Sequence, residues 1–402
     1  MRWLGNKGPL LAEIHAAALK AGFKGGTVCD LFAGSGSVGR FFRAQGCRVL
    51  STDLMNCSHV FQKAYLESDG APRFEGLKQY WEQQSPAPQS RLANLEEKTG
   101  ESWIPFLKLL RYLEEGLPPE EGMLYRQFSA AGEAQRNYLS PENAGRLDGI
   151  LNQLRAWRVS ASLTENELCI LLASCIDAAD RVANISGTYG AYLKKMQGSA
   201  MRSLELRVPA LVTGPVGVAH REDALEWISS VECELLYLDP PYNQRQYPAN
   251  YHLPEIISLL PFEDSEQRLE DSIYGKTGLI PWKDKASPLC SRRGEECFQS
   301  MRQMLKEAKA DIVVFSYSEE GILNRSELEQ ILQEWSGTGG TSSLTLMEIP
   351  YRRFRSDAHK PQEPGVQKRT FRPAPGRSAD EVHEWLFVAT RDRSEEAVVD
   401  PS

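Results

Sequence analysis

An apolar run that ends in an acid, two prolines and a tyrosine constrains this 402-residue chain more than any other feature. Residues 235–238 read Leu-Leu-Tyr-Leu and are followed by Asp239, Pro240, Pro241 and Tyr242. A short apolar run with prolines after it predicts a buried strand, and prolines fix the backbone while donating no N–H. The Asp239 carboxylate and the backbone carbonyls of this segment can accept hydrogen bonds from the amino group of a flat heterocycle, and the Tyr242 ring can stack on the heterocycle. An ordinary strand followed by a proline turn is the alternative.

A glycine turn follows a second strand-like run upstream. Residues 27–33 are apolar apart from Thr27 and Asp30, and Gly34 and Gly36 follow them. The stretch after the turn, residues 37–43, has a helical pattern. Glycines at such a turn allow sharp bending and close approach of a ligand to the backbone.

Acids on both sides of this turn indicate the kind of ligand. Residues 48–52 predict another strand, and Asp53 stands at its end, where nucleotide-type cofactors place their ribose hydroxyls. Asp30 precedes the glycines and is suited to a cationic group. With two glycines rather than three, the pattern fits a cofactor with an amino-acid end and a ribose, such as S-adenosylmethionine, better than a dinucleotide.

Four segments resemble the N6-adenine DNA methyltransferases of the Dam and FokI-methylase type, the class with a DPPY motif. They are residues 2–8, 30–36, 184–195 and 239–252, and their order along the chain fits that family. The resemblance implies an α/β fold with a Rossmann-like, S-adenosylmethionine-dependent methyltransferase sheet. It also implies double-stranded DNA as the substrate, and it raises the question of a restriction endonuclease encoded nearby.

The pattern and the resemblance together predict a cofactor site. In it, Trp3 would form an apolar wall, and Lys7 would lie near the methionine carboxylate. Glu222 and Asp223 end the strand before the DPPY segment, where either acid could bond the adenine amino group of the cofactor. Asp223 is favoured, and a helix cap ahead of Ala224 is an equally good interpretation of it. The predicted cofactor-binding residues are Trp3, Lys7, Asp30, Phe32, Gly34, Gly36, Asp53, Asp223 and Asp239.

The predicted catalytic residues are Asp239, Pro240 and Tyr242. The Asp239 carboxylate and the Pro240 carbonyl would accept hydrogen bonds from the adenine amino group, and these bonds strengthen as positive charge builds on the nitrogen. Tyr242 would stack on the base, which must leave the duplex to reach this site. The residues expected to hold the flipped nucleotide are Asn243, Gln246, Tyr247, Asn250 and Tyr251, whereas His252 is expected to be a packed structural histidine.

A basic stretch is the main candidate for contacts with DNA phosphates. The net charge of the whole chain is −8, so such contacts require a local excess of positive charge. Residues 351–377 contain eight lysines and arginines and two acids, and Arg352, Arg353 and Arg355 lie at its start. Binding of nucleic acid depends on such local charge rather than on the net charge. A solvated surface hairpin is the alternative.

The hydrophobic pattern predicts a discontinuous catalytic domain. Residues 1–60 and 206–402 alternate strand-like and helix-like segments, which predicts a mostly parallel sheet. Residues 61–205 are helical in pattern, with Thr164 and Glu167 marking a helix start, and are predicted to be an inserted target-recognition domain. Later strands are expected at residues 217–220, 311–316, 344–349 and 385–390, and a helix at 297–309.

Composition excludes several classes of protein. No apolar run is long enough to span a bilayer, and the amino-terminal residues lack the apolar core of a signal peptide. The eight cysteines include no CxxC pair, so we expect no metal site, even at Cys290 and Cys297, and a cytoplasmic protein with reduced thiols.

Three other functions remain open on the residues alone. An RNA adenine or guanine methyltransferase could use a similar DPPY segment. A non-catalytic specificity subunit could keep the fold without the activity, although the intact Asp239, Tyr242, Gly34 and Gly36 argue against this. N4-cytosine methylation is a narrower rival, because its motif usually begins with serine.

Overall fold

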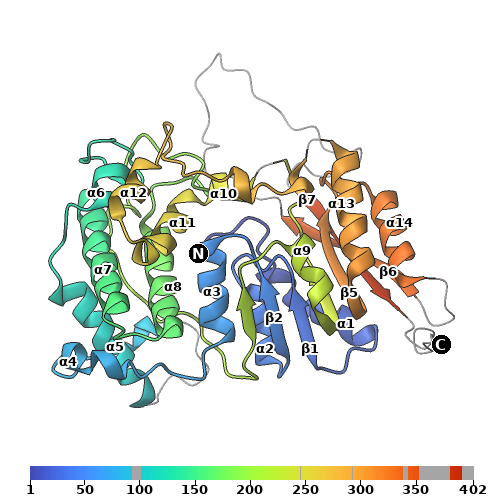
Figure 1. The fold of residues 1–402 in the computed structure, drawn as a ribbon, viewed down its shortest axis with the longest axis horizontal. Coiled ribbons are helices and arrows are strands. Elements are labelled where there is room, and N and C mark those ends of the chain that lie inside the picture. Colours follow the sequence, from blue (N-terminus) through green and yellow to red (C-terminus); the bar gives the residue numbers. More distant parts are fainter. Residues whose placement is uncertain (93–100, 245, 292, 338–342, 353–380, 392–402) are drawn as a thin grey trace. The chain divides into compact units, whose positions relative to one another are not determined.

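The computed structural model describes the chain except residues 93–100, 245, 292, 338–342, 353–380 and 392–402 (Figure 1). The chain forms two compact units, each made of several segments. The first unit comprises Met1–Asn6, Ala33–Arg221 and Tyr247–Ala286. The second comprises Lys7–Phe32, Glu222–Gln246 and Ser287–Ser402.

The strands form a mixed seven-stranded sheet in the order β3-β2-β1-β4-β5-β7-β6. The pairs β1–β4, β2–β3 and β4–β5 are parallel, and β7 pairs antiparallel with both β5 and β6. The predicted α/β class with a mostly parallel sheet is therefore confirmed. The strands are β1 (Thr27–Asp30), β2 (Arg48–Thr52), β3 (Val218–His220), β4 (Glu232–Leu238), β5 (Lys309–Ser318), β6 (Ser343–Arg352) and β7 (Glu381–Thr390).

In the second unit, β4 and β5 form the buried centre of the strand set. Leu235 and Leu238 of β4 pair with Ile312 and Phe315 of β5, and all four side chains are almost fully buried. Strands covered on both faces need continuous apolar sequence, which explains the run that precedes Asp239. The helices of this unit are α1 (Leu11–Lys20), α9 (Ala224–Trp227), α13 (Gly294–Glu307) and α14 (Arg325–Ser336), and Figure 1 shows α13 beside α14.

The first unit is mainly helical among its described residues. Its helices are α2 (Ser37–Ala44), α3 (Asn56–Leu66), α4 (Lys78–Trp81), α5 (Ile104–Arg111), α6 (Met123–Phe128), α7 (Pro141–Val159), α8 (Glu165–Val182), α10 (Tyr247–Asn250), α11 (His252–Leu259) and α12 (Glu266–Asp271). Thr164 and Glu167 form a capping box at the start of α8, as the sequence predicts. Leu168, Leu171 and Leu172 are buried in the core of the unit, and burial of each contributes about 1.5–3 kcal/mol.

A buried carboxylate caps helix α3 within the first unit. Glu255 of α11 accepts hydrogen bonds from the backbone N–H groups of Asn56 and Cys57, each at 2.9 Å. The Lys285 ammonium donates to the same carboxylate at 2.5 Å. A negative charge at a helix amino terminus satisfies N–H groups that have no partner inside the helix.

Short turns of 3-10 helix connect several elements. They are Gly8–Leu10, Glu75–Leu77, Gln89–Arg91, Glu101–Trp103, Ile228–Ser230, Leu260–Phe262, Lys283–Lys285 and Pro288–Cys290, and Tyr112–Gly116 is a π-helical turn. The two compact units follow other boundaries than the predicted division into residues 61–205 and the rest, which stays a prediction about function. In the described part of the chain, no helix has the length and apolar character needed to cross a membrane.

Candidate active site

The acid of the DPPY segment lies in a cluster of charged side chains in the second unit. The Lys7 ammonium donates to Asp239 Oδ1 at 2.7 Å and lies 3.2 Å from Glu384 Oε1. The side chains of Lys7, Asp239 and Glu384 are 4%, 17% and 9% exposed, so little water separates them. Asp239 follows the last residue of β4, Lys7 precedes the 3-10 turn Gly8–Leu10, and Glu384 belongs to β7.

This environment shifts two pKa values. Burial raises the pKa of Asp239 to about 6, while the Lys7 charge opposes the rise and the Glu384 charge adds to it. Burial by itself lowers the pKa of Lys7, but the charges of Asp239 and Glu384 outweigh it, and the net effect raises that pKa. Lys7 is therefore a permanent cation, whereas Asp239 changes charge near neutral pH.

Tyr242 is held beside this cluster. Its carbonyl accepts a hydrogen bond from the Ile322 N–H at 3.0 Å, and its ring meets the Tyr317 ring edge-on, with centroids 6.1 Å apart. The Lys7 ammonium lies 5.8 Å from the centroid of the Tyr242 ring. The ring is half-buried, so part of its surface faces outwards and can receive a flat ligand.

The glycine turn in the first unit has the conformation its sequence predicts. Gly34 and Gly36 have φ angles of 51° and 73°, and Gly36 stands immediately before α2. A Cβ atom on Gly34 would lie 2.6 Å from Trp3 Nε1, so the indole packs directly against this backbone. The turn is also tied to α3, because the Ser58 hydroxyl donates to the Gly34 carbonyl.

Asp53 braces the same turn. Its two carboxylate oxygens accept hydrogen bonds from the N–H groups of Gly34 and Met55, both at 2.9 Å. Burial raises the pKa of Asp53, although these two N–H donors lower it in part. The side chain is half-buried, and each carboxylate oxygen can accept a second hydrogen bond, so Asp53 can also receive a ribose hydroxyl.

Aromatic stacking fixes Trp3. Its ring stacks on that of Tyr251 at a centroid distance of 4.3 Å and an angle of 15°, and Tyr247 lies 6.1 Å away. The Tyr251 hydroxyl accepts a hydrogen bond from the Leu4 N–H at 2.6 Å. Tyr251 is fully buried, so its predicted contact with a nucleotide would require the ring to become exposed.

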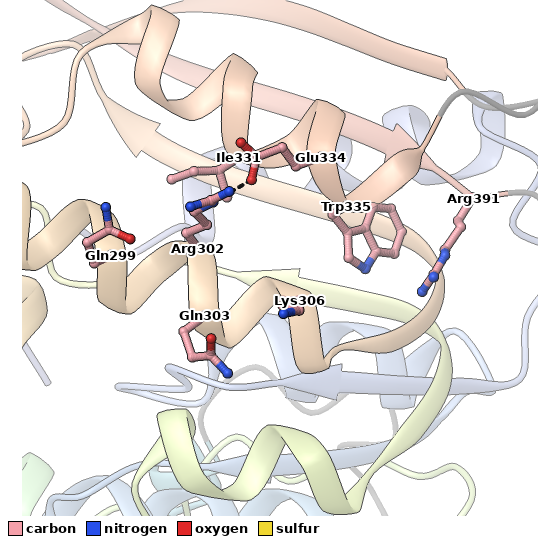
Figure 2. Close-up of a pocket in the computed structure, with 8 residues that line it drawn as sticks. All are labelled: Gln299, Arg302, Gln303, Lys306, Ile331, Glu334, Trp335 and Arg391. Carbon is pink, nitrogen blue, oxygen red and sulfur yellow. Dashed lines mark hydrogen bonds and ion pairs between the residues drawn. The ribbon is translucent and has the colours of Figure 1, made fainter.

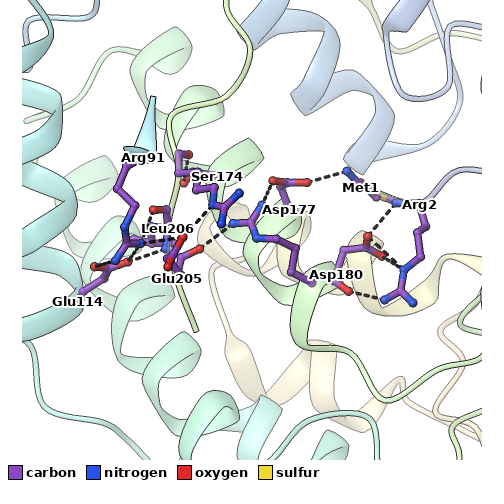
Figure 3. Close-up of polar contacts among 11 residues, drawn as sticks. Met1, Arg2, Arg91, Glu114, Ser174, Asp177, Asp180, Glu205 and Leu206 are labelled. Atoms are coloured by element: carbon purple, nitrogen blue, oxygen red, sulfur yellow. Dashed lines mark hydrogen bonds and ion pairs between the residues drawn. The ribbon is translucent and has the colours of Figure 1, made fainter. Parts of the chain in front are cut away.

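Helix α8 holds the segment that carries Trp3 (Figure 3). The Asp180 carboxylate accepts hydrogen bonds from the backbone N–H and the side chain of Arg2, at 2.7 and 3.4 Å. The Tyr189 hydroxyl donates to Asp180 at 2.9 Å, and the Tyr189 N–H donates to the Asn250 carbonyl. The segment 184–195, predicted only by resemblance, thus supports the amino-terminal motif.

Other predicted site residues have varied surroundings. Asp223 accepts the Leu225 N–H at 2.9 Å, so it does cap α9, and its contact with a cofactor stays a prediction. The side-chain amide of Gln246 exchanges hydrogen bonds with the backbone of Ser287. Asp30 is buried, whereas Phe32 and Asn243 are half-buried.

Two further predictions concern His252 and the basic stretch. His252 is fully buried, and burial lowers its pKa to about 4, which suits a packed neutral histidine. Arg352 is the last residue of β6. Arg353 and Arg355 lie outside the described residues, and so does most of the basic stretch.

A surface pocket on the second unit lies at a different place (Figure 2). Arg302, Lys306 and Arg391 line it, and the Arg302 side chain is paired with Glu334 at 2.5 Å. Lys306 is near the end of α13, just before β5 begins. Because β4 and β5 are parallel, this pocket is at the opposite end of these strands from Asp239.

The chain belongs to the D12 class N6 adenine-specific DNA methyltransferase family, whose model matches residues 3–331. The family predicted from the four sequence segments is thereby confirmed.

Among curated proteins, the chain is 32% identical over 397 residues to the type II methyltransferase M.FokI of Planomicrobium okeanokoites, covering 98% of this chain and 53% of that protein. It is 31% identical over 330 residues to the type II methyltransferase M.NlaIII of Neisseria lactamica, covering 82% of this chain and 84% of that protein. It is 32% identical over 358 residues to the modification methylase StsI of Streptococcus sanguinis, covering 89% and 49%. The chain thus spans about half the length of M.FokI and StsI.

Glu384 and Asp180 are two polar residues that sequence reasoning missed. Glu384 lies beyond the region of the family match, and nothing in the sequence near it indicates a contact with Lys7. Asp180 is one of several acids on an amphipathic helix, and only the fold shows that it holds Arg2.

Proposed function

We propose that this protein transfers a methyl group from S-adenosylmethionine to N6 of a flipped adenine at a specific site in double-stranded DNA. The observation that carries the proposal is the half-buried Asp239 carboxylate at the end of β4, oriented by Lys7 and followed by Pro240, Pro241 and Tyr242, in a chain of the D12 family. We place the reaction in the cytoplasm.

The residues of the glycine turn fit the proposed cofactor. The backbone at Gly34 packs against the Trp3 indole and leaves no room for a side chain. A backbone without a side chain also allows a ligand to approach it closely. Asp53 has carboxylate lone pairs for ribose hydroxyls, and Trp3 supplies a flat apolar wall. S-adenosylmethionine, when bound, supplies an activated methyl group on its sulfonium.

The residues of the DPPY segment act on the adenine. The Asp239 carboxylate and the Pro240 carbonyl accept the two hydrogens of the amino group, which localises the lone pair on the nitrogen. Both hydrogen bonds strengthen as the nitrogen becomes positive, so they stabilise the transition state more than the ground state. Tyr242 stacks on the base with a contact of about 1–3 kcal/mol.

Site specificity requires contacts to base edges elsewhere. The type II methyltransferases M.FokI and M.NlaIII support a site-specific reaction and a role beside a restriction endonuclease. We assign phosphate contacts to residues 351–377 and base contacts to residues 61–205, since phosphate contacts position the protein and base contacts specify the sequence.

Nucleoside analysis by mass spectrometry tests the proposal. The purified protein is incubated with S-adenosylmethionine and either duplex DNA or RNA, and N6-methyladenine and N4-methylcytosine are measured. We expect N6-methyladenine in DNA only, none with the Asp239→Ala variant, and normal activity with Glu348→Gln, a control that loses one exposed carboxylate on β6. Methylated RNA or methylated cytosine alone would overturn the proposal.

A further inference from the structure

A buried carboxylate of β7 completes the charged cluster around Asp239. The Ser316 hydroxyl of β5 donates to Glu384 Oε1 at 2.8 Å, and the same oxygen lies 3.2 Å from the Lys7 ammonium. Ser318 of β5 and Glu384 of β7 are partners in the antiparallel pairing, so backbone hydrogen bonds fix the position of this acid. Two carboxylates share one ammonium, which leaves one negative charge in excess when all three are ionised.

The reaction proposed above releases a proton, and this inference rests on that reaction. An adenine N6 that has gained a methyl group carries one hydrogen too many and a positive charge. The N6–H bond must break, with its electron pair staying on nitrogen, and the proton must bond to an acceptor. Of the described groups, Asp239 is the one whose carboxylate is proposed to contact that hydrogen.

We propose that Glu384 is a positioning residue that, together with Lys7, makes the Asp239 carboxylate the acceptor of this proton. Lys7 holds Asp239 ionised and oriented before the transfer. Glu384 raises the affinity of Asp239 for a proton, because a second carboxylate nearby disfavours the charged form. After transfer, the neutral Asp239 leaves Lys7 and Glu384 as a balanced ion pair, so the excess charge of the cluster is removed.

The distances give the size of the effect. With Lys7 Nζ at 2.7 Å from Asp239 Oδ1 and 3.2 Å from Glu384 Oε1, the two carboxylate oxygens are within about 6 Å of each other. At an effective dielectric constant of about 20, one unit charge at that distance changes a titration midpoint by about two pH units. Burial is the main cause of the raised pKa of Asp239, and the Glu384 charge adds to the rise.

The other titratable groups that face the cluster do not replace Glu384. Tyr242 adjoins Lys7, and Tyr237 interacts with Asp239, Asp30 and Glu384. Burial raises the pKa of Tyr237 well above its usual range, so this phenol stays neutral through the pH range in which Asp239 titrates.

A direct titration of Asp239 in the cofactor-free protein tests the inference. Carbon-13 NMR of protein labelled at aspartate carboxyl carbons follows each titration, and the Asp239→Asn spectrum identifies the signal. We expect Glu384→Gln to lower the Asp239 midpoint by about two pH units, and Lys7→Met to raise it. Ser316→Ala removes a hydrogen bond that partly compensates the Glu384 negative charge, so it should raise the Asp239 midpoint by a smaller amount. Glu348→Gln should not change the midpoint.

Methylation rates supply the second measurement. Single-turnover rates should fall as the pH drops below the Asp239 midpoint, because the protonated acid cannot accept the hydrogen bond or the proton. The acidic limb should move to lower pH in Glu384→Gln, with a slower plateau, and to higher pH in Lys7→Met. A merely structural role would lower rates without moving the two limbs in opposite directions.

The two proposals fail in different ways. If the wild-type protein methylates DNA adenine but the midpoints of Glu384→Gln and Lys7→Met do not move apart, the inference about Glu384 is wrong. If the wild-type protein methylates no DNA, the proposed function is wrong, whatever the titrations give. Thermal melts identify any variant that does not fold, and Ser316→Ala then carries the test.

Discussion

Replacing Gly34 with alanine should weaken binding of S-adenosylmethionine more than it destabilises the fold. The new Cβ would lie 2.6 Å from Trp3 Nε1 and 2.9 Å from Trp3 Cε2, closer than a Cβ atom comes to a non-bonded heavy atom. The indole cannot recede easily, because it is stacked on the buried Tyr251 ring at 4.3 Å. Trp3 must therefore shift along the turn and change the surface that we assign to the cofactor.

The magnitude follows from two contributions. A φ angle of 51° costs an L-residue about 1–2 kcal/mol relative to glycine. Displacement of Trp3 from Tyr251 removes an aromatic interaction of about 0.5–1.5 kcal/mol. The free energy of unfolding should thus fall by about 1.5–3.5 kcal/mol. Binding of the cofactor should weaken by tenfold or more, which corresponds to at least about 1.4 kcal/mol.

Gly46→Ala is the matched control. Gly46 also has a positive φ angle, 86°, but no heavy atom beyond its chain neighbours lies within 4 Å of the added Cβ. Urea unfolding should therefore show the backbone effect in both variants, and calorimetry with S-adenosylmethionine should show weaker binding in Gly34→Ala alone. Equal affinities in the two variants would refute the reasoning that the contact between Trp3 and Gly34 shapes the cofactor site.

Three further predictions can be checked separately. Asp239→Ala should abolish methylation while leaving S-adenosylmethionine affinity within about threefold in calorimetry, because less than about 1 kcal/mol is assigned to that interaction; a wild-type turnover would contradict the mechanism. Glu255→Gln should lower the free energy of unfolding in urea by about 3 kcal/mol, since it breaks a buried charged cap, and an unchanged midpoint would show that the cap is dispensable. Neutralising Arg352, Arg353 and Arg355 together should weaken binding to specific and random duplexes alike. It should also flatten the dependence of log K on log salt by up to ~0.9 for each phosphate that is no longer neutralised, as salt titrations would show; an unchanged slope would place the DNA interface elsewhere.

Local sequence determined the elements that carry the proposed chemistry. The apolar run before Asp239 predicts a buried strand, and β4 is found there. The run is continuous because both faces of β4 are covered. The glycine turn before α2 and the capping box of Thr164 and Glu167 were also predictable, since each depends on residues within a few positions of one another.

Interactions between distant segments could not be predicted in this way. Lys7 was assigned to a cofactor carboxylate from its motif, which stays a prediction, and its pairing with Asp239 and Glu384 was not predicted. Pairing of β7 with β5 places Glu384 in the cluster, and no local pattern specifies the partner of a strand. Tyr251 was predicted to contact the flipped nucleotide, which stays a prediction, and the stacking of its buried ring on Trp3 was not predicted.

The brace that Asp53 provides changes what a mutation at this position can measure. Its two oxygens hold the N–H groups of Gly34 and Met55 whether or not a ligand is present. Removing the carboxylate would release the turn at both points, so the weaker binding would combine a missing ribose hydrogen bond with the entropy of a loosened loop. A cofactor analogue that lacks the ribose hydroxyls, bound to the unaltered protein, would report the hydrogen bond alone.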